Sequence, residues 1–187
     1  LRAKLPLETD FVCRTLRTVG LGESYLEERI AGPLKPLTDA GLELGYCART
    51  GAVDVRFVAR GCGADADVAA AARIVYELAG EHIFGEGDDE LEQVLLRKLT
   101  ERKQTLVLAE SCTGGFLANR LTNVPGASAV FLAGLVTYSN AAKERFLGVR
   151  AETLAAHGAV SEAVAREMAE GARARTGADF AISVTGI

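Results

Sequence analysis

The sequence predicts an α/β protein in two parts: a small α+β unit, then a sheet covered by helices on both faces. Its 187 residues, 49% of them apolar, suffice for one large core or two smaller ones. Strand-like alternation and helix-like spacing of apolar residues follow one another along the chain. The order of these patterns changes after the glycine-containing stretch His82–Asp89. We therefore expect one domain over residues 1–87 and a second over 88–187.

The first unit has the order strand, helix, strand, strand, helix. Its clearest strand is the third, where apolar and polar residues alternate without a break. Pro33 and Pro36 follow the first helix and are expected to end it. The expected elements are the strand Phe11–Val19, the helix Glu23–Ala31, the strands Leu42–Arg49 and Val53–Arg60, and a helix capped by Asp65 that ends near Leu78.

The second unit alternates helices with continuous apolar strands, which is typical of a sheet buried on both faces. Its first helix begins at Asp88. Its last helix begins at Ser161, a predicted N-cap, and ends at Gly177, a predicted C-cap. The other expected elements are the strands Leu106–Ala109, Ala129–Tyr138 and Ala181–Val184 and the helices Gly115–Thr122 and Ala141–Leu147.

Charge and composition argue against several classes of protein. The net charge is −4, and neither half of the chain, divided at Gly87, carries an excess of Lys and Arg. This balance disfavours binding to a phosphate backbone. No apolar run approaches the roughly 18 residues of a membrane helix, and the sequence shows no basic–apolar leader. We expect a cytoplasmic protein with no membrane partner.

The cysteines and histidines do not have the spacing of metal ligands. No two cysteines form a CxxC pair, and the two histidines stand far apart. We expect no metal and no cofactor, and we expect reduced, buried thiols. The chain starts without Met and stops inside an apolar phrase, so we expect a fragment of a longer protein. The cysteines are Cys13, Cys47, Cys62 and Cys112.

Polar, hydroxyl-rich phrases follow three strands of the second unit. They are Glu110–Gly115, Thr137–Lys143 and Thr185–Gly186, and a fourth, Pro125–Ser128, precedes a strand. Ligands of α/β sheets bind at the carboxyl ends of strands, beside helix N-termini. We therefore expect these four phrases to converge on one site.

Ser111 is the first candidate nucleophile, because it stands where a strand gives way to a helix. Gly114 and Gly115 would let a ligand approach the backbone, whose free N–H groups could hold an oxyanion. The alternative is that Ser111 or Thr113 merely caps the helix. The glycines favour a site, since each costs about 1 kcal/mol against Ala inside a helix. Cys112 is the rival nucleophile, unless it points into the core.

Lys143 is the candidate base. If Asn140 caps the following helix, Lys143 lies in its first turn, where the macrodipole and burial would lower the pKa of the amine. Tyr138 and Asn140 could orient it; the alternative is a solvated surface lysine. His82 and His157 have sequence settings that fit surface or structural roles better than a catalytic one.

At this point the motifs resemble a known family. AESCTGG (109–115), NVPGASAVFLAGLVTYSNAAKERFLGV (123–149), HGAVSEAVAREMAEGAR (157–173) and GADFAISVTGI (177–187) resemble the C-terminal domain of the competence/damage-inducible protein A (CinA) family. The stand-alone form of that domain is the nicotinamide-nucleotide amidase. Residues 1–87, with LRTVGLGES (16–24), resemble the KH-type middle domain of full-length CinA proteins.

The resemblance implies a three-layer α/β amidase domain that hydrolyses nicotinamide mononucleotide to nicotinate mononucleotide and ammonia. It implies Ser111 as nucleophile, Tyr138 and Lys143 as catalytic partners, and Ser128 and Thr185 in the substrate site. The family domain continues past VTGI, so we expect this one to be incomplete at its C-terminus. The expected substrate-binding residues are Thr113, Gly114, Gly115, Ser128, Asn140, Thr185 and Gly186.

The alternatives concern both parts of the chain. The site could belong to a catalytically degenerate nucleotide-binding or interaction protein. KH-type domains often bind nucleic acid, but residues 1–87 are acidic and lack the GxxG backbone clamp. We prefer an interaction or spacer role for them, and the resemblance suggests a homo-oligomer, at least a dimer.

Overall fold

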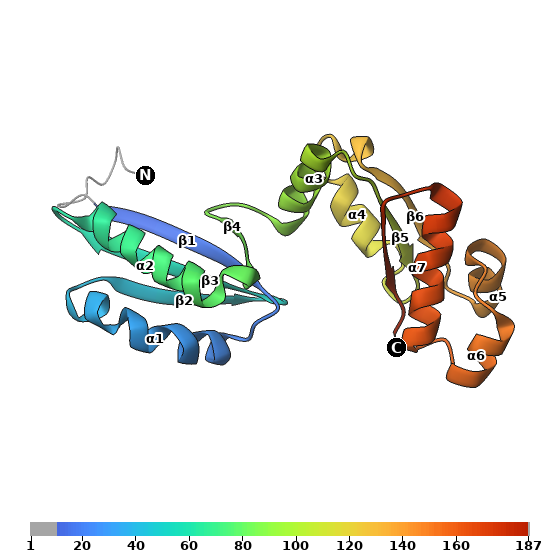
Figure 1. Cartoon of the computed structure of the whole chain (residues 1–187), viewed down its shortest axis with the longest axis horizontal. Helices are drawn as coiled ribbons and strands as arrows, with labels where there is room; N and C mark the ends of the chain where they lie inside the picture. The colour runs from blue at the N-terminus through green and yellow to red at the C-terminus, as the bar shows by residue number, and fades with distance from the viewer. Residues whose placement is uncertain (1–10, 187) are drawn as a thin grey trace. The chain divides into compact units, whose positions relative to one another are not determined.

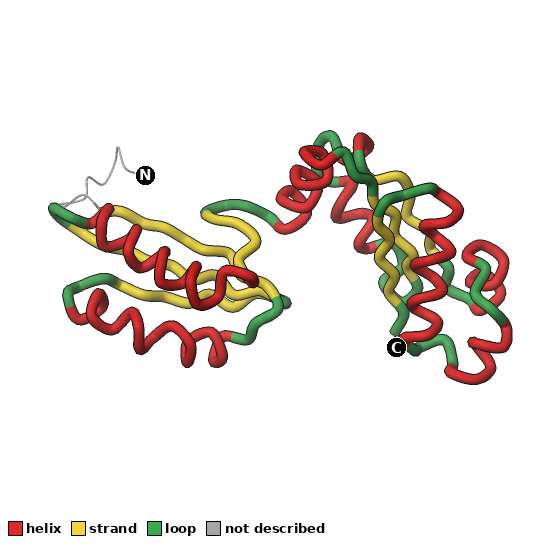
Figure 2. The backbone as a smooth tube through the Cα atoms, in the orientation of Figure 1, coloured by secondary structure: helices red, strands yellow, loops and turns green. Residues whose placement is uncertain are grey.

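The computed structural model describes residues 11–186 and divides into two compact units. The first ends at Leu91 and the second begins at Glu92. Helices and strands mix in both, as the ribbon and the tube show (Figures 1 and 2). Apolar side chains form one buried cluster in the first unit and two in the second. The predicted α/β class is confirmed.

The first unit is a four-stranded antiparallel sheet with the strand order β2-β3-β1-β4. Both long helices pack on the face that presents Val53, Val55 and Phe57, which are at most 3% exposed. Asp54 and Arg56 alternate with them on the other face. The elements are β1 (Phe11–Val19), α1 (Glu23–Asp39), β2 (Glu43–Arg49), β3 (Ala52–Arg60), α2 (Ala64–Ala79), the 3-10 turn Gly80–His82 and β4 (Ile83–Glu86).

Three expectations for this unit need correction. Helix α1 does not stop at residue 31 but continues through Pro33 and Pro36. Its buried Ile30 and Leu34 pack on the sheet, and this burial offsets the lost hydrogen bonds. Within the expected boundary stretch, residues 83–86 form β4, a strand that the predicted order of elements lacks and that pairs with β1. Helix α2 follows Gly63, so Asp65 lies in its first turn and is not its cap.

The second unit has three layers around a parallel sheet with the order β6-β5-β7. Val107 and Ala109 of the central strand face α7, whereas Leu106 and Leu108 face α3 and α4. The elements are α3 (Leu91–Arg102), β5 (Leu106–Glu110), α4 (Phe116–Thr122), the 3-10 turn Ala127–Ala129, β6 (Phe131–Val136), α5 (Asn140–Ala142), the π-helical turn Lys143–Leu147, α6 (Ala151–His157), α7 (Glu162–Thr176) and β7 (Phe180–Val184).

The parallel register brings three strand ends to one edge of the sheet. Glu110 pairs with Val136 on one side and with Val184 on the other. The loops that follow these residues therefore emerge side by side, as the sequence predicted. The predicted caps of α7 are also confirmed: the Ser161 hydroxyl accepts a hydrogen bond from the Val164 N–H, and Gly177 has a φ of 71°.

Other expectations for this unit are wrong. Helix α3 begins at Leu91, so Asp88 lies outside it, and α6 has no counterpart among the predicted elements. The predicted helix over residues 141–147 is a short α-helix followed by a π-helical turn. The four cysteines are free as expected, but they are exposed, not buried.

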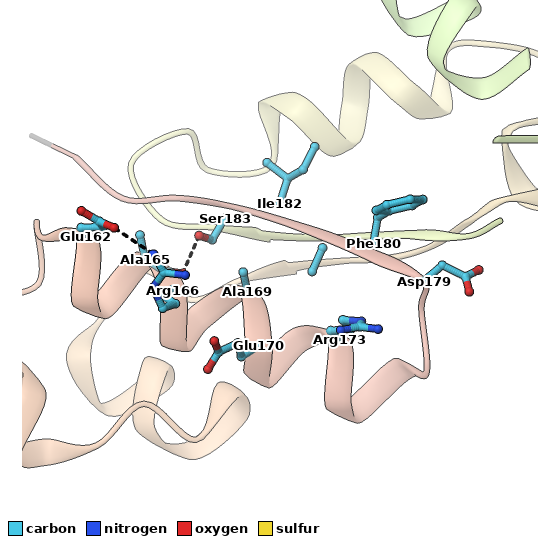
Figure 3. Close-up of a pocket in the computed structure, with 11 residues that line it drawn as sticks. Glu162, Ala165, Arg166, Ala169, Glu170, Arg173, Asp179, Phe180, Ile182 and Ser183 are labelled. Atoms are coloured by element: carbon cyan, nitrogen blue, oxygen red, sulfur yellow. Dashed lines mark hydrogen bonds and ion pairs between the residues drawn. The ribbon is translucent and has the colours of Figure 1, made fainter. Parts of the chain in front are cut away.

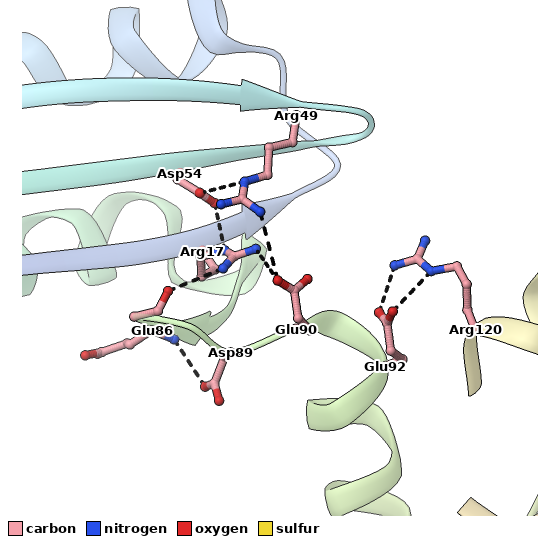
Figure 4. Close-up of polar contacts among 9 residues, drawn as sticks. Arg17, Arg49, Asp54, Glu86, Asp89, Glu90, Glu92 and Arg120 are labelled. Atoms are coloured by element: carbon pink, nitrogen blue, oxygen red, sulfur yellow. Dashed lines mark hydrogen bonds and ion pairs between the residues drawn. The ribbon is translucent and has the colours of Figure 1, made fainter. Parts of the chain in front are cut away.

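An ion cluster holds the chain after β4 against the open face of the first sheet (Figure 4). The Arg17 guanidinium is 2.8 Å from the Asp54 carboxylate and 3.5 Å from that of Glu90. It also donates to the Gly87 carbonyl at 3.3 Å, and Arg49 contacts Asp54 at 2.9 Å. Arg17 and Asp54 are each 4% exposed, so removing one charge would leave the other buried with only its partly exposed second partner, Glu90 or Arg49.

Asp54→Asn is therefore expected to lower the free energy of unfolding of the first unit by about 3 kcal/mol. The matched control is Asp39→Asn, which breaks an exposed pair with Lys35. This control should change stability by about 0.5 kcal/mol or less. Urea unfolding followed by circular dichroism measures both, and equal losses for the two variants would contradict the role of the cluster.

Candidate functional site

Ser111 and Lys143 meet at the carboxyl edge of the second sheet. Ser111 directly follows β5, and Lys143 begins the π-helical turn that comes after β6. The Lys143 Nζ lies 2.9 Å from the Ser111 Oγ. Ser111 is 6% exposed and Lys143 only 1%, so water has little access to the pair. A hydroxyl and an amine are thus in direct contact in a buried setting, the geometry of a nucleophile and its base.

The Lys143 amine has three oxygen atoms within hydrogen-bond distance. The Lys143 Nζ also donates to the carbonyl oxygens of Thr137, at 2.9 Å, and Tyr138, at 3.1 Å. A neutral amine has two N–H groups, which the carbonyls engage, and a lone pair that can accept from the Ser111 hydroxyl. Burial lowers the pKa of Lys143, against a smaller opposing effect of Cys112. Burial therefore shifts the equilibrium of this amine toward its neutral form, the form that can accept a proton.

The loop after β6 is held in place by backbone and cap interactions. The Thr137 N–H donates to the Glu110 carbonyl at 2.8 Å, which extends the pairing of β5 and β6 by one residue. Ser139, and not Asn140, is the N-cap: its hydroxyl accepts from the Ala142 N–H at 3.1 Å. Ser139 has an extended backbone, whereas Asn140 is already the first helical residue.

Glu110 is a buried carboxylate that sequence reasoning missed. Its side chain accepts hydrogen bonds from the N–H groups of Gly115, Leu117 and Ala118 at 2.8–3.1 Å. Burial by itself raises the pKa of Glu110, but the nearby Thr113 hydroxyl and these three backbone hydrogen bonds outweigh it and lower the pKa. An acidic residue that ends an otherwise apolar, buried strand was the available signal.

This carboxylate changes the expected oxyanion site. The Gly115 N–H points to Glu110, and the Gly114 N–H donates to the Ser111 carbonyl at 3.1 Å. The two glycine N–H groups therefore have partners and are not free to hold an oxyanion. Among the described residues, no hydrogen bond engages the N–H groups of Cys112 and Thr113. These two residues directly follow Ser111 in the chain, and theirs are the unengaged N–H groups among residues 112–115.

Four other predicted site residues lie at the same edge of the sheet, but their side chains form no hydrogen bond with Ser111 or Lys143 among the described residues. The Tyr138 side chain is 75% exposed, and only its carbonyl contacts Lys143. Asn140 is exposed at the start of α5, and the Thr185 hydroxyl donates to the Ala159 carbonyl at 2.8 Å. A Cβ on Gly186 would lie 3.1 Å from the Cys112 Sγ, so these two loops are in close contact.

Ser128 does not join the others. It lies in the 3-10 turn that precedes β6, hence at the amino edge of the parallel sheet. Ser111 follows β5 at the opposite, carboxyl edge. The expectation that all four polar phrases converge is therefore wrong for residues 125–128 of this chain.

The histidines lie outside this pair. His82 belongs to the first unit, where its Nδ1 is 3.2 Å from the Val19 carbonyl oxygen. His157 is exposed at the end of α6.

A hollow of about 540 Å³ lies between α7 and β7 (Figure 3). Arg166, Arg173 and Phe180 are among its lining residues, and Ser111 and Lys143 are not. The chemistry of the paired side chains, and not this hollow, marks the candidate site.

Within the described residues, no helix is both long and apolar enough to cross a membrane.

Known families match both parts of the chain. The model described as "CinA C-terminal domain" matches residues 88–187, and "Damage-inducible protein CinA KH domain" matches residues 13–85. A CinA-like protein of Anaeromyxobacter sp. (strain K) is 47% identical over 165 residues, which are 88% of this chain and 40% of that protein. A CinA-like protein of Chlorobaculum tepidum is 44% identical over 187 residues, 97% of this chain and 44% of that protein.

Solved structures agree with the sequence matches. The competence/damage inducible protein CihA from Agrobacterium tumefaciens has 47% sequence identity and a TM-score of 0.51. The match covers 51% of this chain and 58% of that one. The chain spans about two fifths of the length of the curated relatives it matches.

Glu110→Gln is expected to lower the free energy of unfolding by about 2 kcal/mol, because an amide cannot accept from all three N–H groups. The lowered pKa means that the carboxylate stabilises the fold above its ordinary pKa. This stabilisation is lost as the pH falls through the folded-state value. Thermal unfolding between pH 3 and 7 measures both effects. The exposed Glu162→Gln is the matched control, and a Glu110→Gln protein as stable as this control contradicts the anchoring role.

Proposed function

The chain belongs to the CinA family, and we propose that it hydrolyses the carboxamide of nicotinamide mononucleotide to nicotinate mononucleotide and ammonia. The observation that carries the proposal is the buried Lys143 amine, 2.9 Å from the Ser111 hydroxyl and held by two carbonyl oxygens. We assign the activity to residues 88–187, whose motifs resemble the amidase domain, and a supporting role to residues 1–87.

In the first half of the reaction, neutral Lys143 accepts the hydroxyl proton of Ser111, and the Ser111 Oγ bonds to the amide carbonyl carbon. The C–N bond of the tetrahedral intermediate then breaks. The leaving nitrogen takes the proton from Lys143 and departs as ammonia. An ester between Ser111 and the nicotinoyl group remains.

In the second half, Lys143 accepts a proton from water, whose oxygen attacks the ester carbonyl carbon. The Ser111 C–O bond breaks, the serine regains a proton from Lys143, and nicotinate mononucleotide is released. The negative oxygen of both tetrahedral intermediates needs hydrogen-bond donors. The unengaged N–H groups of Cys112 and Thr113 are the donors that we assign to it.

Four groups that follow the strand ends at this sheet edge are the candidates for substrate contacts. We assign the Tyr138 phenol, Asn140, Thr185 and Gly186 to the substrate rather than to proton transfer. The Tyr138 phenol is largely exposed, and the structure shows only its backbone oxygen on Lys143. A role as a binding group therefore fits this side chain better than a role as a base.

Ser111→Ala and Lys143→Ala should each lower ammonia release from nicotinamide mononucleotide by about a thousandfold or more, because the two residues act as a unit. The full-length protein is assayed, with circular dichroism to verify folding. Ser24→Ala and Lys98→Ala, at exposed positions, are the matched controls and should keep full activity.

Two results would count against the proposal. If Ser111→Ala keeps its activity, Ser111 is not the nucleophile, and Cys112 becomes the candidate. If the folded wild-type protein releases no ammonia, the amidase proposal is wrong, and the alternative is a catalytically degenerate nucleotide-binding or interaction protein.

A further inference from the structure

The segment that carries Lys143 rests on one stripe of helix α7. Glu167, Gly171 and Arg175 are spaced four residues apart, so they lie above one another on one helix face. Each contacts a different part of the segment that runs from Arg145 to Arg150. We call these three residues the α7 stripe.

Gly171 makes the closest approach. A Cβ at this position would overlap the carbonyl oxygen of Leu147 and lie 2.7 Å from its carbonyl carbon. The obstacle is backbone, so no side-chain rotation could relieve the clash. Only glycine lets the π-helical turn and α7 pack at this distance, although glycine costs about 1 kcal/mol inside a helix.

The other two residues of the stripe bind either side of that contact. The Glu167 carboxylate accepts from the Arg150 backbone N–H at 2.9 Å and from its guanidinium at 2.8 Å, and also from the Thr153 hydroxyl. The Arg150 backbone and side-chain bonds, with that of Thr153, lower the pKa of Glu167 to about 2. The Arg175 guanidinium donates to the Arg145 carbonyl at 3.4 Å.

Leu147, which contacts Gly171, lies in the same π-helical turn as Lys143, so these contacts are coupled to the position of the lysine. Lys143 and Leu147 are the first and last residues of one π-helical turn, and π-turns often occur at functional sites. The Val149 N–H donates to the Lys143 carbonyl at 3.3 Å, which closes the turn onto the lysine. Leu147 and Val149 belong with Met168 of α7 to one buried apolar cluster. A displacement of Leu147 must therefore move the backbone of Lys143.

We propose that the α7 stripe positions the general base: the contact of Gly171 with Leu147 sets how far Lys143 reaches beneath Ser111, and Glu167 and Arg175 hold the segment on either side. Within residues 11–186, no hydrogen bond or ion pair joins the stripe to Ser111 or Lys143. It acts through the π-helical turn. The inference rests on the proposed amidase function for its catalytic consequence, but not for the position of Lys143.

The test is Gly171→Ala in the full-length protein, with two readouts. The first is the pH dependence of kcat and KM for ammonia release. The second is the pKa of Lys143, measured by NMR on protein with ¹³C-labelled lysine and assigned by the signal lost in Lys143→Met. Gly32→Ala is the matched control, because Gly32 is also inside a helix but its Cβ would meet nothing within 4 Å.

In Gly171→Ala, the displaced amine gains access to water, so its pKa should rise by about one unit or more toward the ordinary value. Since the neutral amine is the active form, the rising limb of kcat should move to higher pH by the same amount, with KM nearly unchanged. Gly32→Ala should match the wild type in both readouts. A folded Gly171→Ala protein with the wild-type Lys143 pKa overturns the proposal.

Glu167→Gln serves if Gly171→Ala does not fold. It weakens one end of the stripe, and a smaller rise in the Lys143 pKa is expected; an unchanged pKa overturns the proposal.

If the wild type releases no ammonia but the Lys143 pKa rises in Gly171→Ala, the positioning role holds and the proposed function fails. If ammonia release falls while the Lys143 pKa stays constant, the positioning role is wrong and the amidase function is not affected.

Discussion

The structure of the second unit depends on burying one amine. Lys143 is 1% exposed, and a charged ammonium in that position would carry a large desolvation cost. The fold reduces this cost by supplying two backbone carbonyls and one hydroxyl as partners, and by lowering the pKa of the amine. The parallel sheet makes this possible, because it brings the ends of β5 and β6 to the same edge.

The same edge of the sheet also buries a carboxylate, which hydrogen bonds stabilise in its charged form. Glu110 directly precedes Ser111, and three backbone N–H groups at the start of α4 bind its carboxylate. The hydrogen bonds keep the acid ionised, whereas burial favours the neutral base. The pKa values of both groups are thus lowered, that of Glu110 by hydrogen bonds to its ionised form and that of Lys143 by burial. Glu110 thereby fixes the turn after the nucleophile without entering the reaction.

Much of this could be predicted from the sequence, because the signals were local. Alternation along β3, the caps of α7 and the polar phrases after parallel strands follow from patterns of a few residues. Other features depended on contacts that no local pattern records. Helix α1 continues through two prolines because its apolar face is buried. The pairing of β4, the carbonyl role of Tyr138 and the glycine contact at Gly171 arise only when distant segments meet.

Mass spectrometry of the full-length protein, quenched with acid during turnover of nicotinamide mononucleotide, tests the Ser111–Lys143 account most directly. A nucleophilic serine forms a covalent ester before water releases the product. The account predicts that the nicotinoyl nucleotide is attached to the peptide that contains Ser111 and Cys112, through the serine oxygen. The same adduct on the Cys112 sulfur, or turnover with no adduct in wild type while Ser111→Ala keeps full activity, would contradict it.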